Sequence, residues 1–367
     1  MAPATSVSQQ FLLSPAELSF LHSSLSLVPP IRPDGRSPTQ FRPLVAESGI
    51  LPAANGSARV CFADGTEAIV GVKAEVEKSS VRPGALGDLI ADEAEDDDDV
   101  AEDNGNGKQG AGESGWVELS IEVPGYRDDD ALPIFLSAML TEALVADGRL
   151  KDRLWINRRF HWKLSIDILL LSAPLTYPLP LLSITTHLAL LSARLPKLIS
   201  EGDEDPLFDD DWDASTYLYP LNAKGERMFR PAITLLVMSV GPNFIFDPSK
   251  EELAVADGVL AVSAGMTEAA SLQSGTKLRL LSLRTIDPPS RLSPPGLPNA
   301  LNHIAMGTAP LPPLEAFAAR EATQDMGVWN PPRGGIKRQV VAQIVKAVLE
   351  PGGVAEEVME GLVNVAT

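Results

Sequence analysis

The longest apolar run of the chain extends from Leu164 to Ala193, is rich in leucine and carries Asp167 as its only charged residue when histidine is counted as neutral. A membrane-spanning helix needs about 20 continuous apolar residues. Prolines interrupt helical hydrogen bonding, and three of them divide this run into shorter pieces: Pro174, Pro178 and Pro180. The run therefore predicts a buried strand over 162–171 and a buried helix over 179–195, with no membrane association.

Strand patterns lie on both sides of this run. Residues 57–62 and 67–76 flank Asp64-Gly65, a strong β-hairpin signal. Residues 116–123 alternate polar and apolar side chains, as a half-buried strand does. Further strands are expected at 154–156, 232–240, 243–246, 259–263 and 277–283, so a second sheet is implied.

Helix patterns occur at both ends and in the middle of the chain. Ser14-Pro15-Ala16-Glu17 is a capping box with proline at the first helical position. Residues 132–145 also predict a helix. An apolar stripe over 335–349 predicts a helix that docks on the second sheet. The proline-rich segment 288–332 is interpreted as a surface excursion.

The formal charge of −19 is concentrated in two segments. Residues 88–103 hold 10 acids and 201–213 hold 8, with no base in either, so the other 338 residues carry 31 acids against 30 bases. The folded body is thus nearly neutral, and the acidic total does not exclude a nucleic-acid partner. Both segments are interpreted as solvated loops, although they could also recruit basic partners.

The chain has few residues for a Cys/His zinc site or for disulfide formation. One cysteine and four histidines cannot form a typical four-ligand Cys/His zinc site, and one thiol cannot form an internal disulfide. We interpret Cys61 as a small buried hydrophobe and His161 and His187 as core or surface residues. No secretory signal opens the chain, so a reducing intracellular compartment is expected.

Several short strings, taken in order, resemble the RNase PH-like ring subunits of the RNA exosome. They are Arg32-Pro-Asp-Gly-Arg36, Gly56-Ser-Ala-Arg-Val60, Val70-Gly-Val-Lys-Ala-Glu75, Ser165-Ile-Asp-Ile-Leu-Leu170 and Asp247-Pro-Ser-Lys-Glu-Glu252. The resemblance covers about residues 13–283 and the helix at 335–349. It implies an α+β, RNase PH-like fold with two sheet-and-helix halves.

The resemblance divides the chain into three regions. Residues 1–30 would form an N-terminal tail and helix, residues 31–220 the first half, and residues 221–367 the second half with the C-terminal helix. The first half would contain a disordered acidic insertion at 78–114 and an acidic loop at 200–215, because neither segment carries enough apolar surface to offset the entropy of ordering.

Active members of this family cleave RNA from its 3′ end with inorganic phosphate. The resemblance implies an aspartate on the central strand, a second one five positions later, and then a glycine-rich turn with threonine and arginine. Asp167 matches the first aspartate, but Ser172 stands at the second position and Ala173-Pro-Leu-Thr-Tyr-Pro178 at the turn. Losing one charge-stabilising donor costs about 100- to 1000-fold in rate, so no useful activity is expected.

An arginine-rich loop that the active enzymes carry before the helix at 132 is also reduced. Only Arg127 remains there, followed by Asp128, Asp129 and Asp130, which would repel phosphate. We therefore expect no catalytic residue, cofactor or metal. Asp167 is interpreted as a relic position with a structural role.

A basic cluster is the candidate for RNA contact: Arg149, Lys151, Arg153, Arg158 and Arg159, with Lys163 nearby. Such residues could line an RNA path, or form an ordinary solvated loop or an intersubunit salt-bridge patch. Trp155, Phe160 and Trp162 could stack on bases or belong to the core.

The leading hypothesis is a non-catalytic ring subunit of the RNA exosome that supports 3′–5′ RNA processing and degradation, including ribosomal RNA maturation. The resemblance implies related subunits in a hetero-hexameric ring, cap proteins, a separate catalytic nuclease and RNA in a central channel. It also implies nuclear, nucleolar and cytoplasmic pools. One alternative is a phosphate-dependent 3′–5′ exoribonuclease with a site shared with a partner, and another is an RNA-binding module that acts alone.

Overall fold

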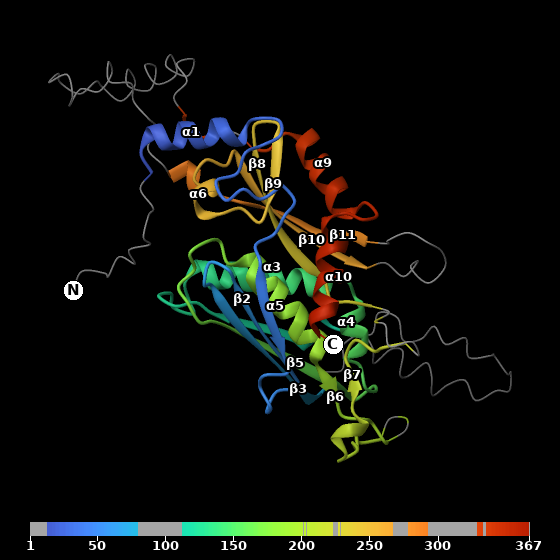
Figure 1. The fold of residues 1–367 in the computed structure, drawn as a ribbon. Helices are drawn as coiled ribbons and strands as arrows, with labels where there is room; N and C mark the ends of the chain where they lie inside the picture. Colours follow the sequence, from blue (N-terminus) through green and yellow to red (C-terminus); the bar gives the residue numbers. More distant parts are fainter. Residues whose placement is uncertain are drawn as a thin grey trace. The chain divides into compact units, whose positions relative to one another are not determined.

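Two compact units make up the fold of this protein, for which we use a computed structural model (Figure 1). The structure describes residues 13–79, 112–200, 202, 204–222, 227, 229–266, 278–292, 329–332 and 335–366. Unit 1 comprises the described residues up to Pro43, Pro174–Pro180 and those of Thr234–Val358. Unit 2 comprises the described residues of Leu44–Ala173, of Leu181–Ile233 and from Met359 onward.

The units interleave along the sequence. Residues 31–43, which the sequence analysis assigned to the first half, group with unit 1. The physical reason is that side chains of this segment, such as Arg32, bind the segment around Asp247 and Glu252 in unit 1.

Unit 2 is built on a five-stranded sheet with the order β1-β2-β3-β5-β4. The strands are β1 (Leu44–Ser48), β2 (Gly56–Phe62), β3 (Glu67–Lys78), β4 (Val117–Glu122) and β5 (Phe160–Leu170). The hairpin predicted at Asp64-Gly65 is confirmed, because β2 and β3 pair antiparallel. β5 pairs antiparallel with β3 and parallel with β4, and this central position agrees with its apolar sequence.

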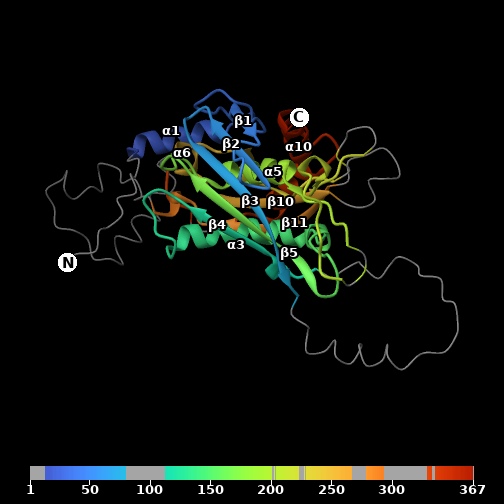
Figure 2. The ribbon, with the colours of Figure 1, turned by 90° about the horizontal axis from the view of Figure 1, so that it is seen from below.

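Two helices cover one face of this sheet, α3 (Ala131–Ala146) and α5 (Leu179–Ser192) (Figures 1 and 2). Side chains on the covered face are therefore buried, and those on the other face are more exposed. Along β4, Val117, Leu119 and Ile121 are buried and the residues between them are exposed. The predicted alternation is thus confirmed. Shorter elements of unit 2 are η1 (Ser114–Trp116), α4 (Arg149–Arg153), β6 (Arg194–Leu195), η2 (Trp212–Ala214) and β7 (Thr216–Tyr217).

Unit 1 contains the predicted second sheet, with the order β11-β10-β8-β9. Its strands are β8 (Ile233–Val240), β9 (Asn243–Phe246), β10 (Gly258–Met266) and β11 (Leu278–Ile286). Its helices are α1 (Pro15–Leu25), α6 (Lys250–Leu253), η4 (Pro289–Leu292) and α9 (Arg338–Leu349). α9 contacts β9, β10 and β11, as predicted. The last helix, α10 (Val354–Ala366), runs from unit 1 into unit 2.

Some elements differ from the sequence-based expectations. Residues 154–156 form only an isolated bridge from Trp155 to His161, because the Asn157 side chain accepts hydrogen bonds from two following backbone N–H groups and turns the chain there. β1, α4 and α10 were not predicted. Most of the predicted insertion at 78–114 and of the excursion at 288–332 lies outside the described residues.

The apolar run from Leu164 onward forms the end of β5, a proline-rich turn and α5. In the described part of the chain, no helix is long and apolar enough to cross a membrane.

Candidate functional site

Asp167 lies near the C-terminal end of β5, on the face of the unit 2 sheet that carries the exposed side chains. Its direct neighbours across the ladder are Gly71 on β3 and Ser120 on β4. The Ser120 hydroxyl donates a hydrogen bond of 2.6 Å to Asp167 Oδ1. Among the described residues, no group of three or more His, Cys, Asp or Glu side chains is placed to hold a metal ion.

Ser172 occupies the position where a second aspartate was expected from the family pattern. Its hydroxyl accepts a hydrogen bond of 3.1 Å from the Glu67 backbone N–H. The neighbouring Leu171 backbone N–H donates a hydrogen bond of 2.8 Å to the Glu67 carbonyl at the end of the β3–β5 pairing. Ser172 therefore closes the end of the sheet, a role that needs a hydroxyl and no charge.

The turn that replaces the phosphate-binding turn belongs to unit 1. Arg42 Nη1 donates a hydrogen bond of 3.0 Å to Thr176 Oγ1. Pro174 and Pro178 have no N–H to offer to an anion. The Thr176 hydroxyl oxygen thus accepts a hydrogen bond from an arginine of the same chain.

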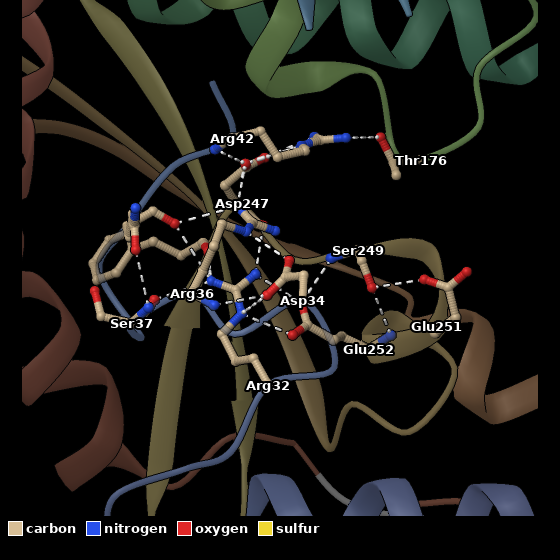
Figure 3. Close-up of polar contacts among 12 residues, drawn as sticks. Arg32, Asp34, Arg36, Ser37, Arg42, Thr176, Asp247, Ser249, Glu251 and Glu252 are labelled. Carbon is tan, nitrogen blue, oxygen red and sulfur yellow. Dashed lines mark hydrogen bonds and ion pairs between the residues drawn. The ribbon is translucent and has the colours of Figure 1, made fainter. Parts of the chain in front are cut away.

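Arg42 is one member of an arginine–carboxylate cluster in unit 1, shown in Figure 3. The cluster consists of three arginines and three acids: Arg32, Arg36, Arg42, Asp34, Asp247 and Glu252. Asp247 Oδ1 accepts a hydrogen bond of 2.7 Å from Arg42 Nη2, and Asp247 Oδ2 accepts one of 2.8 Å from Arg36 Nη1. Three positive and three negative charges balance, so no net positive charge remains for a phosphate.

Arg32 is the most deeply buried cation of the cluster. Its Nε and Nη2 donate hydrogen bonds of 2.8 and 2.9 Å to the two carboxylate oxygens of Glu252, and both side chains are fully buried. Arg32 also donates to the backbone carbonyls of Phe246 and Asp247. A buried arginine needs such complete pairing, because an uncompensated buried charge is very costly.

The local backbone explains how Asp247 and Glu252 are positioned. Asp247 has a positive φ of 47°, which aspartate tolerates better than most residues. Ser249 and Glu252 then form a capping box at the start of α6. Both segments, 32–36 and 247–252, carry strings typical of the family, but their binding to each other was not predicted. Their complementary charges were the signal that could have indicated this.

The basic cluster separates into two groups in the structure. Arg149 and Arg153, on α4, lie over aromatic rings of unit 2, with the Arg149 Cζ 4.3 Å from the ring centre of Phe229 and that of Arg153 5.1 Å from that of Tyr219. Arg153 also donates to the Leu218 carbonyl. Burial lowers the pKa of Arg153. These two side chains therefore contribute to the packing of unit 2.

The second group is more accessible. Arg158 and Arg159 are exposed, and Lys151 is partly exposed on α4. Arg159 forms a 3.0 Å ion pair with Asp205, and Lys163 one of 3.1 Å with Glu118. Arg149, Lys151, Arg153, Arg158 and Arg159 precede β5, whereas Asp167 lies near the C-terminal end of this strand. Lys163 lies on β5 itself, four residues before Asp167 and on the same face of the sheet.

Of the nearby aromatic residues, Trp162 belongs to the core, whereas Trp155 and Phe160 are half-buried. Trp162 is buried and packs against Phe208 with ring centres 4.9 Å apart. His161 stacks on Trp116 at 4.3 Å. Arg127, the remainder of the arginine-rich loop, is exposed and lies 3.4 Å from the Asp129 carboxylate.

Comparison with known proteins identifies the family of this chain. Residues 40–196 match the model of the 3′ exoribonuclease family, domain 1. The Saccharomyces cerevisiae protein named exosome complex component RRP42 is 30% identical over 257 residues, which cover 68% of this chain and 81% of that protein. This chain belongs to the RRP42 family of exosome complex components. The resemblance drawn from the short strings is thereby confirmed.

A second yeast protein and a solved structure are also similar to this chain. Exosome complex component rrp42 of Schizosaccharomyces pombe is 32% identical over 276 residues, or 71% of this chain and 80% of that protein. A solved structure described as the Archaeoglobus fulgidus exosome with RNA bound to the active site is 17% identical, with a TM-score of 0.48 over 74% of this chain and 87% of that one. The family assignment rests on the two yeast relatives.

Proposed function

We propose that this chain is a non-catalytic ring subunit of the RNA exosome that supports 3′–5′ RNA processing and degradation, including ribosomal RNA maturation. It would pair with related RNase PH-like subunits in a hetero-hexameric ring. Cap proteins and a separate catalytic nuclease would complete the assembly, and RNA would pass through its channel. Membership in the RRP42 family supports this proposal.

The proposal that the chain is non-catalytic rests on the hydrogen bonds made at the turn around Thr176. Phosphorolysis needs donors that are free to hold an attacking phosphate. The Arg42 guanidinium beside this turn already donates to the Thr176 hydroxyl oxygen and to the Asp247 carboxylate. A phosphate at Thr176 would have to compete with a buried carboxylate for the same guanidinium.

The position of Asp167 supports the same conclusion. Its carboxylate is exposed on the sheet and accepts from Ser120. Ser172, which replaces the second acid, is engaged by a backbone N–H. Lys73 on β3 is close enough for the charge of Asp167, after that of Glu75, to raise its pKa, but Lys73 is already paired with Glu75 at 2.6 Å. A carboxylate without a second acid beside it is a poor candidate for acid–base or metal-assisted chemistry.

Affinity purification of the tagged full-length chain from its own cells tests the assembly. We expect recovery in one complex with related ring subunits and cap proteins, with a native mass that fits one copy of each. Recovery as a stable monomer or as a self-oligomer would contradict the ring assignment and favour an RNA-binding module that acts alone.

A phosphorolysis assay on the purified complex tests the non-catalytic role. The substitution Asp167→Asn is nearly isosteric, so we expect no change in phosphate-dependent release of nucleoside diphosphates. A loss of that release in Asp167→Asn, with the complex intact, would establish the alternative of a site completed by a partner. Ser120→Ala, which removes only the hydrogen bond to Asp167, serves as the matched control.

We propose further that the basic cluster contributes to RNA binding mainly through its accessible members. Arg158, Arg159 and Lys151 could reach phosphates, whereas Arg149 and Arg153 would act indirectly by packing unit 2. Replacing Arg158 and Arg159 by alanine should reduce RNA crosslinking to the complex and lower its dependence on salt. Lys73→Ala, which removes an exposed lysine from the sheet, is the control; an equal loss there would argue against a specific path.

Pools in the nucleus, nucleolus and cytoplasm are part of the same proposal. Imaging of a fluorescently tagged chain at its native expression level tests them, and exclusion from the nucleus would contradict a role in ribosomal RNA maturation.

A further inference from the structure

The described residues of the second acidic segment belong to a hairpin, and most of them are exposed, as expected of a solvated loop. We call residues 194–200, 202 and 204–217 the acidic hairpin. Its base is the β6–β7 pair, in which Arg194 pairs with Tyr217 and Leu195 with Thr216. Further out, Leu198 pairs with Phe208, and the Ile199 N–H donates to the Leu207 carbonyl at 2.8 Å. Figure 1 shows the hairpin continuing beyond β6 and β7.

The two arms of the acidic hairpin have unequal lengths. Asp209 N donates to Lys197 O at 2.9 Å, which fixes the register of the outer part. One residue separates Lys197 from Leu195, whereas six residues, 210–215, separate Asp209 from Thr216. Five residues of the returning arm are therefore looped out. This bulge carries Asp210, Asp211, Trp212 and Asp213, and part of it forms the helical turn η2.

The hairpin is held against the rest of unit 2 by specific contacts. Phe208 packs on Trp162, Arg159 pairs with Asp205 at 3.0 Å, and the Asn157 side chain donates to the Glu204 carbonyl at 2.9 Å. An anchored hairpin presents its side chains in a fixed arrangement. A binding partner would therefore meet a surface that is already ordered, which lowers the entropic cost of association.

Apolar side chains remain exposed on this acidic element. Trp212 is 48% exposed, Ile199 52% and Leu207 62%. Ile199 and Leu207 are cross-strand neighbours, so their side chains share one face of the hairpin. Tryptophan is among the residues that most often dominate binding energy at protein interfaces. Exposed apolar groups of this kind on an anchored element are typical of a surface that a partner covers.

The charge of the hairpin identifies the chemistry of that partner. Residues 201–213 contain 8 acids and no base. Asp210, Asp211 and Asp213 are exposed on either side of Trp212. Such a surface repels RNA phosphates and attracts arginine and lysine, whose cations can also stack on an indole ring.

We propose that the acidic hairpin is a docking surface for a basic, amphipathic peptide segment of another protein. Arginine or lysine side chains of that segment would contact Trp212 and the surrounding carboxylates. Its apolar side chains would cover Ile199 and Leu207. This inference goes beyond the proposed ring function, and the peptide experiment below can fail while the ring assignment holds.

Fluorescence anisotropy with a defined peptide tests the proposal. The probe is a fluorescein-labelled 14-residue peptide of alternating arginine and leucine pairs, titrated with the full-length chain in the complex in which it purifies. Two comparison peptides replace leucine by serine or arginine by glutamate. We expect the basic amphipathic peptide to bind most tightly, the serine peptide to bind more weakly, and the glutamate peptide not to bind.

Substitutions in the hairpin locate the binding. Trp212→Ala should weaken binding by about 10-fold or more, whereas Trp212→Phe, which keeps an aromatic ring, should retain most of it. Replacing Asp210, Asp211 and Asp213 by asparagine should weaken binding and reduce its salt dependence. The chain offers a matched control, in which Asp96, Asp97 and Asp98 of the other acidic segment are replaced by asparagine and the same total charge is removed.

Three results would overturn the proposal. An equal loss of binding in the Asp96, Asp97 and Asp98 control would show general charge attraction. Unchanged binding in Trp212→Ala would show that the indole ring does not contribute to peptide binding. Tighter binding of an RNA oligonucleotide than of the basic peptide, lost in the same hairpin variants, would assign the surface to RNA. Recovery of each variant in the same complex as the parent chain verifies its folding.

Discussion

The Arg32 guanidinium and the Glu252 carboxylate meet in a two-point ion pair that is fully buried, although 220 positions separate the two residues in the sequence. The pair joins the segment after α1 to α6 within unit 1. Breaking a buried pair by removing one partner costs about 3–5 kcal/mol, because the remaining charge stays buried. The segment 32–42 is thus part of the core of unit 1.

Substitution Glu252→Gln tests this pair. Glutamine keeps the shape of the side chain and can still cap α6, but it removes the buried countercharge of Arg32 and leaves only the half-exposed Asp34 carboxylate, 3.7 Å away. We expect a loss of about 3 kcal/mol in the free energy of unfolding, measured by chemical denaturation. Glu251→Gln, on the same helix but away from Arg32, should change it by less than about 1 kcal/mol. Equal effects of both changes would contradict the importance of the pair.

Asp247 combines a charge role with a backbone role, and two substitutions separate them. Asp247→Asn tolerates the positive φ but leaves Arg36 and Arg42 without their shared carboxylate, so we expect a loss of about 3 kcal/mol. Asp247→Ala should cost about 1 kcal/mol more, because alanine is strained in the left-handed region. Thermal unfolding of the two variants side by side measures the difference, and identical melting temperatures would argue against backbone strain.

Gly56, at the start of β2, lies where α5 ends against the sheet. A Cβ atom at this position would lie 2.5 Å from the Ala193 Cα and 2.6 Å from the Ala189 carbonyl oxygen, and both are backbone atoms that cannot rotate away. Gly56→Ala should therefore destabilise the protein by about 2–3 kcal/mol or prevent folding. The amount of soluble chain and its melting temperature report this effect.

Gly71 on β3 provides the matched control for Gly56. A Cβ atom there would lie 3.3 Å from the flexible Leu51 Cδ1 atom. Gly71→Ala should be tolerated within about 1 kcal/mol, because the leucine side chain can move. Equal destabilisation by both alanines would show that the approach of α5 to Gly56 is not the cause.

His187 predicts a dependence of stability on pH. It is fully buried in α5, and burial, reinforced by the positive charge of Arg230, lowers its pKa to about 3. The unfolded chain binds a proton below its usual pKa of about 6.5, whereas the folded chain does not until about 3, so stability is lost as the pH falls through this window. At pH 5 the loss from this group should be about 2 kcal/mol relative to pH 7.

Denaturation at pH 7 and pH 5 measures this loss. His187→Leu should reduce the pH dependence, because leucine has no proton to bind. His161 adds to the same trend, since burial lowers its pKa as well. His22→Gln, which changes a partly exposed histidine whose imidazole lies 3.9 Å from Asp257, serves as the control, and a pH dependence that is unchanged in His187→Leu would assign the effect to other groups.

Local sequence patterns anticipated much of the fold. The Asp64-Gly65 turn, the alternation over 116–123 and the stripe over 335–349 each correspond to an observed element, because hairpins, half-buried strands and amphipathic helices are encoded within about ten residues. Short elements were missed. β1 has five residues and α4 also five, lengths at which pattern and propensity carry little information.

The sequence by itself determined the family, the apolar central strand β5 and the loss of an acid at Ser172, because these depend on residue identity and local spacing. Only the tertiary structure decided which distant residues meet. It paired Arg32 with Glu252, gave Thr176 to Arg42, and turned an acidic segment into a hairpin anchored by Phe208 on Trp162. Such contacts depend on how segments far apart in the sequence pack together. Burying an unpaired charge is costly, so a buried charge is found with a partner, but which partner it meets depends on the tertiary packing.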